Sequence, residues 1–401
     1  MSCQNFSDNH LKIGLVGFGF MGKTHLYAVE NLKFFTEPQA LGCSAEISSV
    51  STSREETAID AANRYAIPRP CASEDEIIND PDIDIIDVCS PNNAHIGTIK
   101  KAIANGKHVI CEKPLTATLD EAHEAVLLER EARERGLVTA TVFNNRYLSP
   151  VIRACQIISE GGIGDILSFT FTYYHDSCID PSRRAGWKQN ADFGGGTLAD
   201  LGPHVIDLCH LLVGRIKSIS ATSQIAFPTH EDASGALWET NADEAFYMTC
   251  KAECGAVGSI NVSKIAHGSS DGLAFEIYGT KGALRFSLMD MNYLYFYDAS
   301  SPQYPAGGNR GWTRIECVGR YPSPAGTFPS VKAPAGWLRG HVGCMAAFLH
   351  AVASTGDLTA DNLDGCLPPP SFADGAAVMS VIAAAKESDS KNGAFVGVEY
   401  F

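Results

Sequence analysis

The sequence lacks an excess of basic residues, a long apolar run and a regular spacing of cysteines. Its 401 residues include 31 Lys and Arg but 46 Asp and Glu, which gives a net charge of −15. We therefore expect no nucleic-acid partner, because phosphate binding needs a concentrated basic surface. No run approaches the roughly 18 apolar residues of a membrane span, and residues 1–10 are too polar for a secretory signal. These features predict a cytoplasmic protein without a membrane partner.

The thirteen cysteines are scattered and odd in number. Only Cys250 and Cys254 are close in sequence, and no second pair completes a zinc site. We therefore predict reduced thiols and no metal. Hydrophobic residues make up 45% of the chain and charged residues 19%, which excludes a disordered protein.

The first third of the chain alternates short apolar runs with helical patterns. Strands are predicted at 11–16, 47–52, 83–89, 108–111 and 137–143, with helices from Gly22 and at 55–65, 94–105 and 118–136. Strands separated by helices of this length pair in parallel through right-handed crossovers. The pattern predicts an α/β fold, with a doubly wound Rossmann domain over residues 1–143.

After residue 143 the pattern changes to strands joined by short turns. Strand-like runs lie at 167–174, 216–225, 244–251, 257–265, 274–278 and 283–288. Short connections indicate antiparallel pairs. Residues 144–401 are therefore predicted to form a second α/β domain with a mostly antiparallel open sheet. A long irregular segment, rich in Pro, Gly and Ser, is expected at 298–336.

A glycine-rich loop follows the first predicted strand and opens a helix. Its sequence is Gly17-Phe18-Gly19-Phe20-Met21-Gly22, a G-x-G-x-x-G pattern. Such glycines allow a tight turn and a close approach of pyrophosphate to helix N–H groups. The loop predicts dinucleotide binding by Gly17, Gly19, Phe20 and Met21.

The end of the second predicted strand bears on the choice of cofactor. Ser53 and Arg54 stand there, and no carboxylate occurs before Glu55. Small hydroxyls and a guanidinium suit the 2′-phosphate of NADP, whereas an acidic side chain would bind the ribose of NAD. NADP is favoured over NAD, with the alternative that Glu55 or Glu56 reaches the ribose.

Three further motifs carry a family resemblance. They are Ser90-Pro91-Asn92-Asn93-Ala94-His95, Glu112-Lys113-Pro114, and the segment from Gly194 to Asp207 that contains Asp200-Leu201-Gly202-Pro203-His204. With the glycine loop, they resemble the Gfo/Idh/MocA family of NAD(P)-dependent oxidoreductases. The resemblance implies a Rossmann domain followed by a substrate domain that often forms an oligomer, here a homo-oligomer such as a dimer or tetramer. It also implies that Lys113 reaches both cofactor and substrate, and that Asp200 and His204 line the substrate side.

Oxidation of an alcohol needs a base for the hydroxyl proton and stabilisation of the alkoxide. A helix that starts at or just after Asp200 places Pro203 in its first turn and Asp200, His204 and Asp207 on one face. We predict His204 as the general base, oriented by Asp200. Lys113 follows a strand end and is expected to stabilise the alkoxide. A core histidine beside a helix-capping aspartate is the alternative for this pair.

Other candidate residues follow from their positions in the chain. Ser90, Asn92, His95 and Glu112 are predicted to lie near the cofactor, although turn and helix-cap roles remain open for Asn92 and His95. Substrate contacts are predicted for Lys113, Arg146, Arg184, Trp187, Asp200 and His204. His175, Arg183 and Asn190 fall in the same stretches.

The sequence thus predicts an NAD(P)-dependent enzyme that oxidises a secondary or anomeric hydroxyl of a sugar, sugar derivative, glycoside or inositol by hydride transfer to nicotinamide. Two alternatives remain open. One is a glycoside-cleaving enzyme that uses NAD for transient oxidation, and the other is a cofactor-sensing regulatory protein of the same fold.

Overall fold

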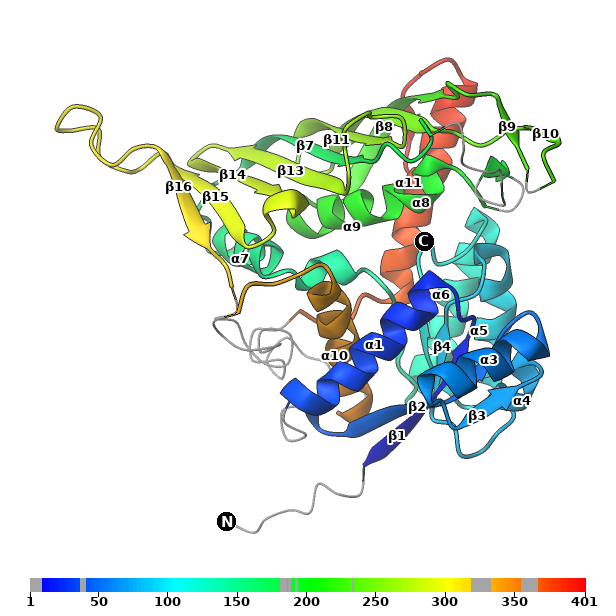
Figure 1. Cartoon of the computed structure of the whole chain (residues 1–401). Helices are drawn as coiled ribbons and strands as arrows, with labels where there is room; N and C mark the ends of the chain where they lie inside the picture. The colour runs from blue at the N-terminus through cyan, green and yellow to red at the C-terminus, as the bar shows by residue number, and fades with distance from the viewer. Residues whose placement is uncertain are drawn as a thin grey trace, which may run out of the picture. The chain divides into compact units, whose positions relative to one another are not determined.

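The computed structural model describes residues 9–36, 41–180, 186, 189–191, 194–232, 234–318, 333–354 and 367–401. They form two compact units. The first comprises Met1–Ser149, Val318–Ala376 and Phe401, and the second comprises Pro150–Cys317 and Ala377–Tyr400. Figure 1 shows the elements of both units. Among the described residues, none of the helices combines the length and the apolar character needed to cross a membrane.

The first unit is built on a six-stranded parallel sheet in the order β3-β2-β1-β4-β5-β6. The strands are β1 (His10–Val16), β2 (Ser44–Ser51), β3 (Arg69–Cys71), β4 (Ile85–Val88), β5 (His108–Cys111) and β6 (Thr139–Thr141). This strand order is that of a dinucleotide-binding Rossmann sheet. The predicted doubly wound sheet is confirmed, and β3 is an additional short edge strand.

The helices of the first unit follow the predicted alternation. They are α1 (Phe20–Phe35), α3 (Glu55–Tyr65), α4 (Glu74–Ile78), α5 (His95–Ala104) and α6 (Leu119–Glu134), with short 3-10 turns η2 (Asn92–Ala94) and η3 (Asn144–Tyr147). Thr118 accepts a hydrogen bond from the Glu121 N–H at 3.3 Å, and this bond belongs to the capping box that starts α6.

A helix from late in the chain completes the first unit. In α10 (Leu338–Ala353), Val342, Met345 and Phe348 are buried in the same core cluster as Ile13 and Leu15 of β1. This helix packs against α1. The sequence analysis assigned every residue after 143 to the second domain. The structure instead places α10 in the first compact unit, because the apolar face of α10 completes the core of that unit.

The second unit contains a nine-stranded sheet in the order β16-β15-β14-β13-β7-β12-β11-β8-β17. Its strands are β7 (Ile166–Tyr174), β8 (Ile216–Gln224), β11 (Ala245–Ala252), β12 (Val257–Ser263), β13 (Gly272–Gly279), β14 (Gly282–Ser287), β15 (Tyr293–Asp298), β16 (Trp312–Glu316) and β17 (Val396–Gly397). Neighbours pair antiparallel except β7 and β12, which are parallel. The predicted mostly antiparallel sheet is confirmed, but β16 is a strand inside the segment predicted to be irregular.

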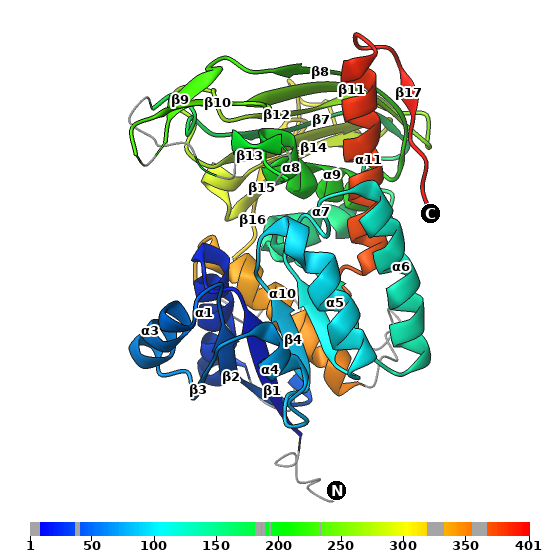
Figure 2. The same cartoon turned by 90° about the vertical axis from the view of Figure 1, so that its right-hand side faces the viewer.

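Helices α8 (Thr197–Asp200) and α9 (Gly202–Leu212) lie against one face of this sheet, as Figure 2 shows. Buried side chains such as Phe169, Phe171 and Ile260 alternate with half-exposed residues along β7 and β12. The period of two places one face of the sheet in the core. The remaining elements are α7 (Ser149–Ser159), α11 (Phe372–Ser390), the β9 (Thr229–Glu231) and β10 (Leu237–Glu239) hairpin, and η6 (Leu288–Asp290).

Candidate active site

The glycine loop connects β1 to α1 with a geometry that suits an anion. Gly17 has φ +95°, and a Cβ placed on it would lie 2.5 Å from the Cys89 carbonyl oxygen. Gly19 precedes α1 without a side-chain cap, and the first turn of this helix contains no acidic residue. A Cβ on Gly19 would meet no atom within 4 Å, so the space above the helix N-terminus is open. The loop therefore fits the pyrophosphate of a dinucleotide.

Four of the predicted cofactor residues beyond the glycines, on the loop and after β2, are exposed or partly exposed. Phe20 is 71% exposed and Met21 is half-buried. Ser53 and Arg54 are exposed after β2, and Arg54 occupies the N-cap position of α3. Within the described part of the chain, the Arg54 guanidinium has no ion pair. Glu55 and Glu56 are also exposed, in the first turn of α3.

His95 lies between two turns at the carboxyl edge of the first sheet. Its ring is fully buried, with Nε2 2.8 Å from the Ser90 carbonyl oxygen and Nδ1 3.1 Å from that of Pro114. Burial lowers the pKa of His95, although the carbonyl contacts oppose this effect. The ring thus ties the turn after β4 to the turn after β5. Asn92 is also buried, in η2.

Lys113 belongs to the turn that follows β5. Its side chain is half-buried, and the Lys113–Pro114 peptide bond is cis. The preceding residue, Glu112, is buried, and its Oε2 accepts a hydrogen bond from the Lys113 N–H at 3.0 Å. The position of Lys113 just beyond a parallel strand agrees with the place where such sheets bind ligands.

A histidine that the sequence analysis did not identify links this turn to α1. His25 Nδ1 lies 2.9 and 3.0 Å from the two carboxylate oxygens of Asp87, and Nε2 lies 3.0 Å from Glu112 Oε1. Burial favours the neutral ring, but the Asp87 carboxylate and hydrogen bonds outweigh it and raise the pKa of His25 well above its usual value. Burial also opposes ionisation of Glu112, yet His25 lowers the Glu112 pKa to about 2. A signal existed in the sequence, since an aspartate within the apolar run 83–89 needs a partner.

The same residues form two groups with ligand atoms close enough for a metal ion. His25, Asp87 and Cys89 form one, and His25, Glu112 and His341 form the other, with the atoms of each within 4.8 Å. Both nitrogens of His25 already face carboxylates. The protonated imidazole therefore supplies the positive charge that the two acids require.

A second polar cluster forms in the other unit, where three neighbouring strands meet. Tyr173 and His175 stand at the end of β7, Lys264 follows β12, and Asp271 precedes β13. Asp271 Oδ1 accepts a hydrogen bond from the Tyr173 hydroxyl at 2.7 Å and lies 3.0 Å from His175 Nε2. Burial opposes ionisation of Asp271, but these contacts and the charge of His204 lower its pKa.

The predicted residues Asp200 and His204 join this cluster. Asp200 Oδ2 accepts a hydrogen bond from Lys264 Nζ at 2.7 Å. The rings of Tyr173 and His204 meet edge-to-face with centroids 5.7 Å apart. The predicted helix start is confirmed, since α9 begins at Gly202 with Pro203 in its first turn, while Asp200 ends the short helix α8. The orientation of His204 by Asp200 stays a prediction.

The start of α8 is fixed by an aspartate from another strand end. Asp243 Oδ2 accepts a hydrogen bond from the Leu198 N–H at 2.7 Å, and its carbonyl oxygen accepts one from the Thr197 N–H at 2.8 Å. Gly196 has φ +110°, and a Cβ there would lie 2.4 Å from Asp243 Oδ1. A glycine is required at 196 both by its conformation and by this close approach.

The predicted substrate contacts differ in their placement. Arg146 is buried in the first unit, where its Nη2 lies 3.4 Å from Asp374 Oδ1. This ion pair gives Arg146 a structural role, and substrate contact stays a prediction. Asn190 is half-buried. Arg183, Arg184 and Trp187 lie outside the described residues.

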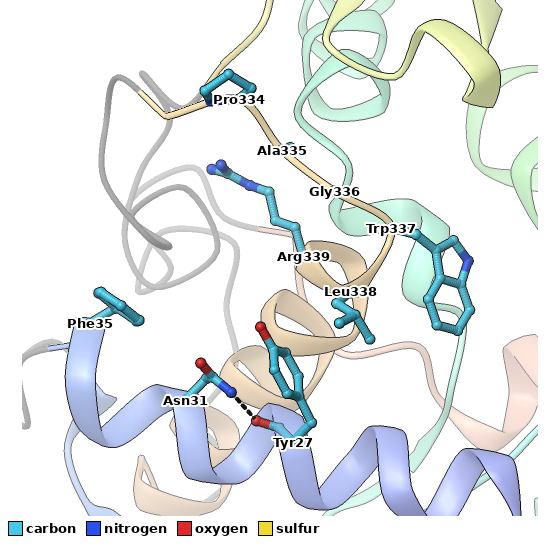
Figure 3. Close-up of a pocket in the computed structure, with 9 residues that line it drawn as sticks. All are labelled: Tyr27, Asn31, Phe35, Pro334, Ala335, Gly336, Trp337, Leu338 and Arg339. Carbon is cyan, nitrogen blue, oxygen red and sulfur yellow. Dashed lines mark hydrogen bonds between the residues drawn. The ribbon is translucent and has the colours of Figure 1, made fainter.

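A pocket of about 640 Å³ lies beside α1 in the first unit. Tyr27, Asn31 and Phe35 of α1 and the stretch from Pro334 to Arg339 line it, and Asn31 donates a hydrogen bond to the Tyr27 carbonyl oxygen at 2.7 Å (Figure 3). Trp337 also contacts the glycine loop, with its ring centroid 5.9 Å from that of Phe20. The pocket was not predicted, because its two walls are about 300 residues apart in sequence.

Comparisons with known proteins agree with these observations. A model of an oxidoreductase family with an NAD-binding Rossmann fold matches residues 11–140, and a model of the GFO/IDH/MocA C-terminal domain matches residues 151–285. Levoglucosan dehydrogenase of Pseudarthrobacter phenanthrenivorans is 30% identical over 396 residues, which are 95% of this chain and 97% of that protein. The scyllo-inositol 2-dehydrogenase (NADP(+)) of Bacillus subtilis is 31% identical over 211 residues, which are 53% of this chain and 54% of that protein.

A solved structure of levoglucosan dehydrogenase is also similar to this chain in three dimensions. Levoglucosan dehydrogenase in complex with NADH and levoglucosan has a TM-score of 0.88 and 29% identity, covering 98% of this chain and 100% of that chain. The two family models match in the expected order, and the relatedness at 30% identity extends over nearly the whole length. The chain is therefore an oxidoreductase of the Gfo/Idh/MocA family, with an NAD-binding Rossmann domain.

Proposed function

We propose that this protein is a dehydrogenase that oxidises a secondary or anomeric hydroxyl of a pyranose, an anhydrosugar or an inositol. The likeness to levoglucosan dehydrogenase over the full length, in sequence and in structure, carries the proposal. The inositol dehydrogenase of Bacillus subtilis extends the candidate substrates to cyclic polyols. All of these compounds present a ring hydroxyl on a C–H carbon, which is the group the reaction needs.

Lys113 and His204 have separate roles in the oxidation of the substrate hydroxyl. A bound nicotinamide cofactor supplies the hydride acceptor. His204 accepts the proton of the substrate hydroxyl, and the Lys113 ammonium stabilises the negative charge that develops on the oxygen. Asp200 orients the His204 imidazole, and its Oδ2 also accepts a hydrogen bond from Lys264 Nζ at 2.7 Å. His175, whose Nε2 lies 3.0 Å from Asp271 Oδ1, uses its Nδ1 to contact another hydroxyl of the ring, while the Tyr173 hydroxyl donates to Asp271 and holds this carboxylate in place.

The test is a substrate panel with variants of both residues. Absorbance at 340 nm is recorded with NAD and NADP against levoglucosan, D-xylose, scyllo-inositol, myo-inositol and aryl glucosides. We expect NAD(P)H formation with at least one of them, and a fall in kcat of about 10²–10⁴-fold in Lys113→Met and in His204→Gln. Normal turnover in both variants would refute the roles. Release of an aglycone without net NAD(P)H would instead indicate glycoside cleavage, and no turnover would favour a regulatory protein.

NADP is proposed as the preferred cofactor. The exposed Arg54 guanidinium stands after β2 without an ion pair among the described residues, at the position where a ribose 2′-phosphate would be bound. Arg54→Ala should raise KM for NADP by about tenfold, corresponding to about 1.4 kcal/mol, and leave KM for NAD unchanged. A preference for NAD that depends on Glu55 or Glu56 would overturn this choice.

We also propose that the protein is a homo-oligomer in the reducing cytoplasm. The face of the nine-stranded sheet opposite α8 and α9 exposes Tyr247 and Val257, and both are apolar enough to pack against another copy. The cysteines of the described residues form no disulfide bond with one another, which suits a reducing compartment. Light scattering after gel filtration tests the assembly, and Tyr247→Lys together with Val257→Lys should produce monomers.

A further inference from the structure

A continuous chain of hydrogen bonds runs through the first unit from β4 to Lys113. Asp87 in β4 accepts from His25 Nδ1 through both oxygens, and His25 Nε2 donates to Glu112 Oε1 at 3.0 Å. The other oxygen of Glu112 accepts from the Lys113 N–H at 3.0 Å. His25 belongs to α1, the helix that starts at the glycine loop. One side chain therefore links the cofactor helix, a central strand and the lysine turn.

This series of hydrogen bonds requires His25 to be protonated. A neutral imidazole carries one N–H, so one of the two carboxylates would face a ring lone pair at about 3 Å. The side chains of His25, Asp87 and Glu112 are almost completely buried, at 2%, 0% and 6% exposure, and water cannot replace the missing donor. Other titratable groups face His25 as well. They are Cys89, with Sγ 3.3 Å from Nδ1, His341, with its ring centroid 6.1 Å away, and the buried thiols of Cys111 and Cys344.

Hydrogen bonds restrain the Glu112 carboxylate in this arrangement. Both of its oxygens are used, one by His25 and one by the backbone of Lys113. Because both oxygens are bonded, the plane of the Glu112 carboxylate is fixed. This plane determines where the Lys113 N–H lies, and therefore the direction of the backbone as it leaves β5 at Lys113. Charge-assisted hydrogen bonds of this kind are about twice as strong as neutral ones.

We propose that His25 is a positioning residue, which sets the orientation of Lys113 through Glu112. The inference rests on the proposed function, in which Lys113 acts on the substrate hydroxyl. A small displacement of a reacting group lowers the rate strongly while leaving binding intact. His25 itself touches neither substrate nor cofactor in this scheme, and its effect on catalysis passes through Lys113.

The first experiment examines the network without using activity. The full-length protein is labelled with ¹⁵N-histidine, and the His25 resonances are assigned by their loss in His25→Gln. We expect both ring nitrogens to be protonated at pH 7, above the ordinary histidine pKa, with both N–H protons shifted downfield by their carboxylate partners. A neutral His25 ring at pH 7 would overturn the proposal, whatever the substrate of the enzyme proves to be.

The second experiment is a double-mutant cycle in kcat, measured with the best substrate of the panel. His25→Gln should lower kcat by about 10–100-fold when Lys113 is present, and by less than about twofold in the Lys113→Met background. The dissociation constant for NADPH, measured by fluorescence, should change by less than about threefold. Equal losses in the two backgrounds would mean that His25 supports only the fold, and the proposal would be wrong.

A matched control is available in the same unit. His108 starts β5 and is half-buried, and its Nδ1 accepts a hydrogen bond from the Val138 N–H at 2.9 Å. His108→Gln should lower stability without changing kcat. If His25→Gln does not fold, Glu112→Gln, which keeps the shape of the side chain, is carried through the same cycle. If Lys113→Met alone retains activity, the proposed role of Lys113 fails, while the NMR result still decides the state of His25.

Discussion

Each unit of this protein contains a histidine–carboxylate cluster, and the two clusters differ in their access to water. In the first unit, His25 is 2% exposed and lies between two buried acids. In the second, Asp271 is 37% exposed and holds Tyr173 and His175. A buried cluster keeps one charge state because any change leaves an unpaired charge in a low dielectric, whereas a partly exposed one can exchange partners with a ligand. The first arrangement suits positioning, and the second suits binding.

The strongest test of this difference between the clusters is to remove a buried acid. Asp87→Ala leaves the His25 charge without its closest partner, and we expect a loss of about 3–5 kcal/mol in the free energy of unfolding. Urea denaturation measures it. The control is Asp82→Ala, because Asp82 is 76% exposed and its contact with Lys12 is long, at 3.8 Å. We expect the control to change stability by less than about 0.5 kcal/mol. Similar losses in both variants would mean that the buried network stabilises the fold no more than an exposed ion pair does.

Acid should reveal the same difference between the clusters. The pKa of Glu112 is about 2 in the folded protein, below its ordinary value of 4.5. A lowered folded pKa adds stability above pH 4.5, and this stability is lost as the pH falls from 4.5 towards 2. Glu112→Gln should therefore flatten the pH dependence of the unfolding free energy in this range more than Asp271→Asn does. An unchanged slope in Glu112→Gln would contradict the buried ion pair.

Much of this architecture follows from local patterns in the sequence. The alternation of β-branched runs and amphipathic helices predicts the six-stranded sheet, because each run is buried on both faces between helices. Lys113, Asp200 and His204 lie in recognisable motifs, and the start of α9 follows from Pro203. These features depend on neighbours within one or two elements.

What the sequence does not predict depends on contacts between distant segments. Lys264 and Asp271 reach the site because β12 and β13 both pair with β7, and nothing local specifies those partners. His25 meets Glu112 across 87 positions. The return of α10 to the first core likewise requires knowledge of which apolar face is left uncovered. A single histidine in a helix carries no such information.

A glycine substitution next to α8 tests how the second cluster depends on the backbone that carries it. Gly196→Ala introduces a Cβ at φ +110°, 2.4 Å from Asp243 Oδ1. We expect a loss of about 1–3 kcal/mol in stability, with a fall in kcat because α8 carries Asp200. Gly255→Ala is the matched control, since its φ is +92° and nothing lies within 4 Å of its Cβ. If Gly255→Ala lowers kcat equally, the effect is one of general strain.

The smallest effect on stability should come from the exposed acid itself. Asp271→Asn keeps an acceptor for Tyr173 and removes a charge that water partly screens, so we expect a loss of less than about 1 kcal/mol. The His175 ring loses its charged partner, and its hydrogen bond to a substrate hydroxyl, worth about 0.5–1.5 kcal/mol, becomes less well oriented. KM for the sugar should then rise by up to about tenfold while kcat changes little. Steady-state kinetics and urea denaturation on the same preparation separate the two quantities. A large loss of stability with unchanged KM would place Asp271 in the same class as Asp87, and the distinction between a closed positioning network and an open binding cluster would not hold.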